Sequence, residues 1–159
     1  MPGYFFKLMS DEEAREISHW QYEPPYDFYD ATSDEDDLQE LLNPERRGDA
    51  YFSVLDEGGE LVGFFQFELE GTTVDVGLGM RPDLTGKGLG GGYLLAGLEF
   101  ARERFSPKRF TLSVTTFNER AIRVYERAGF RRGHVYLHHT SGDEYLFVSM
   151  AREACGSGT

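Results

Sequence analysis

The sequence predicts one mixed α/β domain of the α+β kind, in which helices flank a central, mostly antiparallel sheet. The first observation is a change of period near residue 50, after which three consecutive segments follow the strand pattern and form a meander. The second is helical periodicity over residues 88–104 and 118–128, each followed by further strands. The chain is long enough to bury one core and contains no repeats. We therefore expect a single domain over residues 1–154 and a flexible tail at 155–159.

Local signals justify the expected elements. Ser10 and Glu13 have the spacing of a capping box, which predicts a helix. The pair Pro24 and Pro25 excludes regular helix from the segment that follows, and Ser33 heads a second helix with acidic residues in its first turn. In order, we expect a strand at 4–9, helices at 11–20 and 33–42, strands at 51–55, 61–69 and 73–80, a helix at 88–104, a strand at 110–114, a helix at 118–128, and strands near 130–138 and 144–150.

The composition restricts the partners of the protein. The formal charge is −12, from 16 basic and 28 acidic residues. A nucleic-acid backbone would be repelled by this field, so we expect no nucleic-acid partner, whereas a small cationic molecule suits it. No stretch approaches the roughly 18 apolar residues of a membrane helix and no secretory signal is evident, so we expect no membrane partner and a cytoplasmic location. A single cysteine and the lack of zinc-type Cys/His spacing predict a metal-free protein.

A glycine-rich loop follows the third strand of the meander and opens the next helix. Glycines let backbone N–H groups approach a ligand, and a helix N-terminus adds unsatisfied donors and partial positive charge. This combination predicts a pyrophosphate-binding loop, although a plain tight turn has the same pattern. A Walker loop or a dinucleotide fingerprint would need a different context, so neither fits. The candidate cofactor-binding residues here are Thr85, Gly86, Lys87, Gly88, Leu89, Gly90 and Gly91.

A second motif covers the helix at 118–128 and the two residues after it. Asn118 is a suitable N-cap, Gly129 suits the position just beyond the helix, and Phe130 starts the next strand. Tyr125 lies seven positions after Asn118 and projects from nearly the same face. On its own, this pattern describes a well-capped helix that carries one aromatic residue.

Together the two motifs resemble those of the GNAT superfamily of N-acetyltransferases. The loop of that family reads Gln/Arg-x-x-Gly-x-Gly/Ala, and the segment from Thr85 to Gly90 is similar to it. The family's Asn-x-x-Ala-x-x-x-Tyr-x-x-x-Gly-Phe pattern matches residues 118–130 at every named position. Thr85 departs from the usual Gln or Arg, and Lys87 or Arg81 are candidates to supply the missing charge. The resemblance covers about residues 4–150 and implies a GNAT-type sheet with splayed central strands.

The resemblance implies an acyltransferase that takes acetyl-CoA as co-substrate and passes the acetyl group to an amine by direct attack. It places the pantetheine arm along the backbone of Leu78 and Met80 and the pyrophosphate on the glycine loop. Asn118 and Ala121 are assigned to the cofactor in the same way. Tyr125 matches the family's usual general acid, since a phenol with a pKa of about 10 stays protonated at neutral pH.

The amine must lose a proton before it attacks. Asp75 stands where many family members carry a strand glutamate, and we expect it to be the general base. Glu68 and Glu70 on the preceding strand are alternatives, because alternation puts both on one face of that strand.

The acceptor is expected to bind the N-terminal helices and their connection, where acids lie among aromatics, a composition suited to a cationic amine. Trp20 is expected in the core rather than at the ligand. A protein N-terminus or lysine as acceptor, and a non-catalytic acyl-CoA sensor, remain alternatives. A homodimer through the late strands is also left open. The candidate acceptor-binding residues are Tyr22, Glu23, Tyr26 and Tyr29.

Overall fold

The computed structural model describes residues 3–140 and 143–154, so the tail expected at 155–159 lies outside the described residues. The helices are α1 (Asp11–Ser18), α2 (Glu35–Leu42), α3 (Pro44–Arg47), α4 (Gly90–Phe105) and α5 (Glu119–Arg127), with short 3-10 turns at Tyr26–Tyr29, Ala31–Ser33 and Pro82–Leu84. The strands are β1 (Phe5–Leu8), β2 (Tyr51–Leu55), β3 (Leu61–Glu70), β4 (Thr73–Met80), β5 (Arg109–Thr115), β6 (Arg131–Thr140) and β7 (Asp143–Glu153). Each expected strand and long helix is present, and α3 is an addition.

The strands form one seven-stranded sheet in the order β1-β2-β3-β4-β5-β7-β6. The pairs β1–β2, β2–β3 and β5–β7 are antiparallel, whereas β4 and β5 are parallel. The parallel pairing runs from Thr73 opposite Arg109 to Asp75 opposite Thr111. Among the described residues it ends there, although β4 continues to Met80. The mixed, mostly antiparallel sheet with flanking helices is therefore confirmed, and the splay of its central strands stays a prediction.

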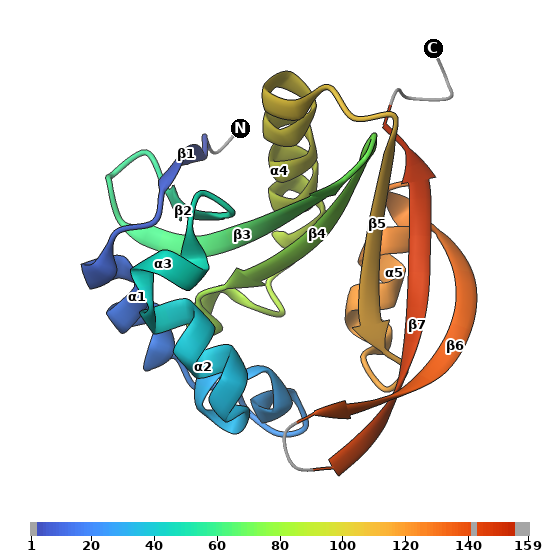
Figure 1. Cartoon of the computed structure of the whole chain (residues 1–159), viewed down its shortest axis with the longest axis horizontal. Helices are drawn as coiled ribbons and strands as arrows, with labels where there is room; N and C mark the ends of the chain where they lie inside the picture. The colour runs from blue at the N-terminus through green and yellow to red at the C-terminus, as the bar shows by residue number, and fades with distance from the viewer. Residues whose placement is uncertain (1–2, 141–142, 155–159) are drawn as a thin grey trace. The chain divides into compact units, whose positions relative to one another are not determined.

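The chain divides into two compact units, so the prediction of one domain over residues 1–154 stays a prediction. The first unit takes the described residues of Met1–Gln66, Leu78–Thr85 and His139–Glu144. Its three helices α1–α3 contact one another in series (Figure 1). Trp20 is buried as expected, in a core shared by Met9, Ala14, Ile17, Leu41, Tyr51 and Leu61.

Helix capping in the first unit follows the sequence with one correction. The capping box of α1 is complete, because Ser10 Oγ accepts from the N–H of Glu13 and the Glu13 carboxylate accepts from the N–H of Ser10. The prediction that Ser33 heads α2 is wrong. Asp34 is the cap, and its carboxylate accepts from Asp37 N–H at 3.0 Å. The two neighbours are both good capping residues, so the local sequence could not choose between them.

The second unit takes the described residues of Phe67–Gly77, Gly86–His138 and Tyr145–Thr159. Figure 1 shows β5, β7 and β6 side by side, with α5 along them. Buried apolar side chains repeat at Leu94, Leu98 and Ala101 of α4, with the helical period. Leu95, by contrast, is exposed, because it is turned by about 100° from Leu94 around the helix.

The strand β6 lies at one end of the sheet order, and it exposes apolar side chains at Val135 and Leu137. An edge strand with exposed apolar residues can pair with another chain. The homodimer through the late strands stays a prediction, because no partner chain is part of the structure.

Candidate active site

The glycine loop has the backbone of a tight, open turn that leads into α4. The N–H of Thr85 donates to the carbonyl of Pro82, and the Thr85 hydroxyl donates to the same carbonyl at 2.8 Å. Gly86 and Gly88 then adopt φ values of +73° and +77°, where a side chain is strained. A Cβ at Gly88 or Gly91 would meet no atom within 4 Å. The backbone of the loop therefore stays accessible to a ligand at the start of a long helix.

The charge beside this loop comes from an unexpected residue. A Cβ built at Gly86 would lie 3.3 Å from Nη1 of Arg120, on the first turn of α5. One turn further along α5, Val124 lies 3.5 Å from the corresponding position at Gly90. The start of α5 thus runs beside the loop and the first residue of α4. Arg120 was not singled out from the sequence, where its only signal was its place two residues after Asn118.

Arg81, one of the two cations suggested for the loop, is engaged elsewhere. Its guanidinium makes a two-point ion pair with Asp83, at 2.6 Å from Nε to Oδ1 and 3.2 Å from Nη2 to Oδ2. It also donates to the carbonyl of Leu61 at 3.1 Å and lies 4.0 Å from Glu60. These contacts close the turn after β4. Lys87, the other suggestion, is exposed on the loop itself.

The Asn118 motif forms the capped helix that the sequence predicted. Asn118 is buried and caps α5, and its Oδ1 accepts from the N–H of Ala121 at 3.2 Å. At the other end Gly129 has a φ of +98°, its N–H donates to Glu126 and the N–H of Phe130 donates to Tyr125, each at 3.0 Å. The backbone of Ala121 is thus used by the cap, while the role of Asn118 toward the cofactor stays a prediction.

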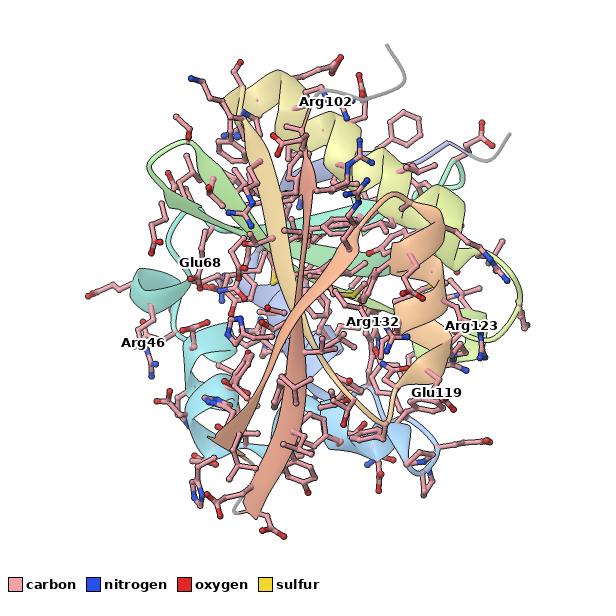
Figure 2. All side chains as sticks on the ribbon, turned by 90° about the vertical axis from the view of Figure 1, so that its right-hand side faces the viewer. Arg46, Glu68, Arg102, Glu119, Arg123 and Arg132 are labelled. Atoms are coloured by element: carbon pink, nitrogen blue, oxygen red, sulfur yellow. The ribbon has the colours of Figure 1, made fainter. Side chains whose placement is uncertain are left out.

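Tyr125 lies in the last turns of α5 and is half-buried. Its ring packs edge-on against Phe130, with the ring centroids 6.2 Å apart. Glu119 and Arg123 mark the course of the same helix in Figure 2. Arg132 of β6 lies beside this helix and pairs with Glu126 at 3.0 Å. The tyrosine is therefore held on a helix that is fixed at both ends and along its side.

Asp75 lies on the face of β4 opposite to the buried Val74 and Val76. Its Oδ1 accepts a hydrogen bond of 2.7 Å from the hydroxyl of Thr111 on β5. The pKa of Asp75 is raised above its ordinary value, mainly because the surrounding atoms desolvate the charged form, and the nearby charge of Glu70 raises it further. The hydrogen bond from Thr111 acts in the opposite direction. Although much of the side chain is accessible, its partial desolvation disfavours the charged form relative to a fully solvated carboxylate.

Tyr22 is anchored at both ends within the first unit. Its N–H donates to Asp30 Oδ1 at 2.8 Å, and its hydroxyl donates to the carbonyl of Met80 at 2.7 Å. The pKa of Tyr22 is raised, first by burial and then by the charge of Asp30. The N–H of Arg81 donates to Val62 of β3, so the Met80 carbonyl in the same peptide group points away from β3. Tyr22 therefore contacts the backbone of β4 on the side that is not paired with β3.

The other candidate acceptor residues are more open to solvent. Glu23 and Tyr29 are exposed, and Tyr26 is half-buried. Tyr29 packs edge-on against Phe28, with the ring centroids 5.0 Å apart. Within residues 3–140 and 143–154, no group of three or more His, Cys, Asp or Glu side chains is arranged to hold a metal ion. Over the same residues, no helix is long and apolar enough to cross a membrane.

Comparison with known protein families identifies the family to which this chain belongs. Residues 12–130 match the family model described as the acetyltransferase (GNAT) family. The chain belongs to this family. Members of this family are acyl-CoA-dependent N-acyltransferases that act on amines, and the family uses acetyl-CoA.

Two curated relatives are mycothiol acetyltransferases. The protein from Acidimicrobium ferrooxidans is 34% identical over 103 residues, which cover 59% of this chain and 33% of the relative. The protein from Clavibacter sepedonicus is 38% identical over 77 residues, which cover 48% of this chain and 25% of the relative. The chain thus matches a third or less of the length of these relatives.

Solved structures share the fold at low sequence identity. A spermidine N-acetyltransferase from Vibrio cholerae in complex with CoA and spermine is 18% identical, with a TM-score of 0.76 and 95% of each chain covered. A GNAT-family acetyltransferase from Bacillus anthracis is 17% identical, with a TM-score of 0.74 and the same coverage. These similarities establish the arrangement of helices and strands.

Proposed function

We propose that the protein transfers the acetyl group of acetyl-CoA to an amine of a small cationic molecule, by direct attack in the cytoplasm. The observation that carries the proposal is the open glycine loop at the start of α4, with the guanidinium of Arg120 beside Gly86. Backbone N–H groups at a helix N-terminus together with an arginine suit a pyrophosphate. In a chain of formal charge −12, this guanidinium gives the loop a local positive charge that suits the CoA phosphates.

The residues of the loop and of α5 would hold the cofactor. Residues 85–91 and Arg120 would bind the phosphates, and Asn118 would contact the pantetheine arm. The backbone of Leu78 and Met80 is assigned to the same arm by the family resemblance. Bound acetyl-CoA would supply the activated thioester. The chain's own residues supply position and proton transfer.

Asp75 and Tyr125 are the proposed acid–base residues. Asp75 takes a proton from the ammonium group of the acceptor, a role that its raised pKa favours. Tyr125 donates its hydroxyl proton to the sulfur that leaves. At neutral pH the base must be deprotonated and the acid must be protonated, and these are the ordinary states of a carboxylate and a phenol.

The acceptor is proposed to be a small polyamine or amino sugar rather than a protein. The net charge of the chain attracts cations, and similar proteins are named spermidine N-acetyltransferase and mycothiol acetyltransferase. Glu23, Tyr26 and Tyr29 would contact the acceptor, because an acid beside aromatic faces suits an ammonium group. Tyr22 would instead position this segment, through its bond to Met80.

The test is a thiol-release assay with acetyl-CoA and a panel of spermidine, spermine, glucosamine and a peptide with a free N-terminus. We expect turnover with a polyamine or amino sugar and little with the peptide. Tyr125→Phe should lose turnover but keep its affinity for acetyl-CoA. Tyr136→Phe is the matched control, because this ring stacks on Phe147 at the surface of β6 and β7. Turnover with the peptide alone would replace the proposed acceptor, and loss of binding in Tyr125→Phe would contradict its role as an acid.

A further inference from the structure

We propose that Thr111 is a positioning residue for the general base: its hydroxyl holds Oδ1 of Asp75, so that Oδ2 receives the proton of the acceptor amine. This inference rests on the proposed function, and it concerns a residue that neither motif contains. In the proton transfer, one N–H bond of the ammonium group breaks and the proton binds Oδ2. The electron pair of that bond stays on the nitrogen, which becomes the nucleophile.

The backbone fixes the relative position of the two side chains. Asp75 and Thr111 lie opposite each other in the parallel pairing of β4 with β5, and theirs is the last pair of that register. Both residues belong to the second unit. Val74 and Phe110, the pair before them, are fully buried and hold the opposite face of the two strands. The hydroxyl and the carboxylate are therefore set on the same face before any ligand binds.

The geometry of the hydrogen bond selects one carboxylate oxygen. Thr111 Oγ1 lies 2.7 Å from Oδ1 of Asp75, within the usual range for a hydroxyl that donates to a carboxylate. Among residues 3–140 and 143–154, the Asp75 side chain makes this one hydrogen bond, which uses Oδ1 and not Oδ2. Because threonine is β-branched, its side chain has few rotamers in a strand. Its hydroxyl is held in place at little entropic cost.

The pKa of Asp75 is a direct reporter of this contact, because the hydrogen bond from Thr111 is one of its causes. Glu68, labelled in Figure 2, and Glu70 come from β3, and Arg109 precedes Thr111 on β5 by two residues. Burial and Glu70 raise the pKa of Asp75, whereas the hydrogen bond from Thr111 lowers it. Removing the hydroxyl and removing the Glu70 charge should therefore move the same titration in opposite directions. The titration therefore reports the hydrogen bond itself, and the pH profile of turnover reports its effect on the base.

The test is a carbon-detected NMR titration of the Asp75 carboxyl, assigned with Asp75→Asn, in the full chain. Thr111→Val keeps the shape but lacks the donor, so the Asp75 titration should move to higher pH. Thr111→Ser should return it toward wild type, and Glu70→Gln should move it to lower pH. An Asp75 titration in Thr111→Val that coincides with wild type would overturn the proposal.

The same variants are then compared in the pH profile of kcat/KM with spermidine. The acidic limb should move to higher pH in Thr111→Val and recover in Thr111→Ser, with the KM for acetyl-CoA unchanged. Failure of the proposed function is distinguishable: wild type would release no thiol with any amine of the panel, or Asp75→Asn would keep the acidic limb. The NMR titration decides the contact of Thr111 with Asp75 in either case.

Discussion

Gly88→Ala is the substitution that most cleanly tests how the loop is used. Gly88 has a φ of +77°, and a Cβ at this position would meet nothing within 4 Å. The added methyl group therefore causes no clash, and its whole effect is on the backbone. For a residue with a side chain, the left-handed conformation costs about 1–2 kcal/mol. Because Gly88 is exposed, the empty loop of the variant can relax to another conformation. Ligand binding must then return the substituted residue to the left-handed conformation, and this free energy is subtracted from the binding free energy.

The assay is isothermal titration of acetyl-CoA into wild type and variant. A cost of about 1–2 kcal/mol corresponds to a Kd that rises about 5- to 30-fold. Gly92→Ala is the matched control, because a Cβ there also meets nothing within 4 Å but the residue lies inside α4. It should leave the Kd unchanged and raise stability by about 0.5–1 kcal/mol. An unchanged Kd in Gly88→Ala would refute the argument that acetyl-CoA binds this conformation of the loop.

Three further substitutions test other parts of the site. Arg120→Gln should lower the affinity for acetyl-CoA and for its 3′-dephospho form about equally, by about 10-fold for one charge-assisted contact. The affinity for S-acetyl-pantetheine, measured in the same titrations, should not change. The control Arg127→Gln, two turns along α5, should leave all three affinities unchanged. Tyr22→Phe leaves the Met80 carbonyl without its donor, so urea unfolding should show a loss of about 1–3 kcal/mol. Because the folded pKa of Asp75 is raised, its stabilising contribution is complete below the unfolded value of about 3.9 and is lost as the pH rises through the folded pKa. Asp75→Asn should therefore gain stability relative to wild type between pH 4 and pH 7, and a constant difference in urea unfolding would contradict the direction of the shift.

The sequence predicts best the features that depend on residues close together along the chain. The capping box at Ser10, the strand alternation of the meander and the glycine beyond α5 each concern residues within a few positions of one another. The two motifs at Thr85–Gly90 and Asn118–Phe130 are local patterns as well, and the family match confirms the GNAT resemblance that they suggested.

The features that the sequence could not predict depend on contacts between distant segments. Arg120 was missed because its proximity to Gly86 arises only when α5 packs beside the loop. The bond from Thr111 to Asp75 spans 36 positions and depends on the register of two parallel strands. Tyr22 has the composition of a ligand contact, but its hydroxyl is directed to a carbonyl 58 positions away. Periodicity and composition contain no information on such pairs.

The central claim is that the glycine loop binds acetyl-CoA, and thermal unfolding of the purified protein tests it most directly. The protein is heated with acetyl-CoA, with NAD and with ATP at matched concentrations. At about 100 times its Kd, a ligand stabilises the native state by about 2.7 kcal/mol, and for a chain of this size the midpoint rises by about 5–11 °C. We expect this shift with acetyl-CoA and none with NAD or ATP. A shift with a nucleotide and none with acetyl-CoA would contradict the claim and reassign the loop to that nucleotide.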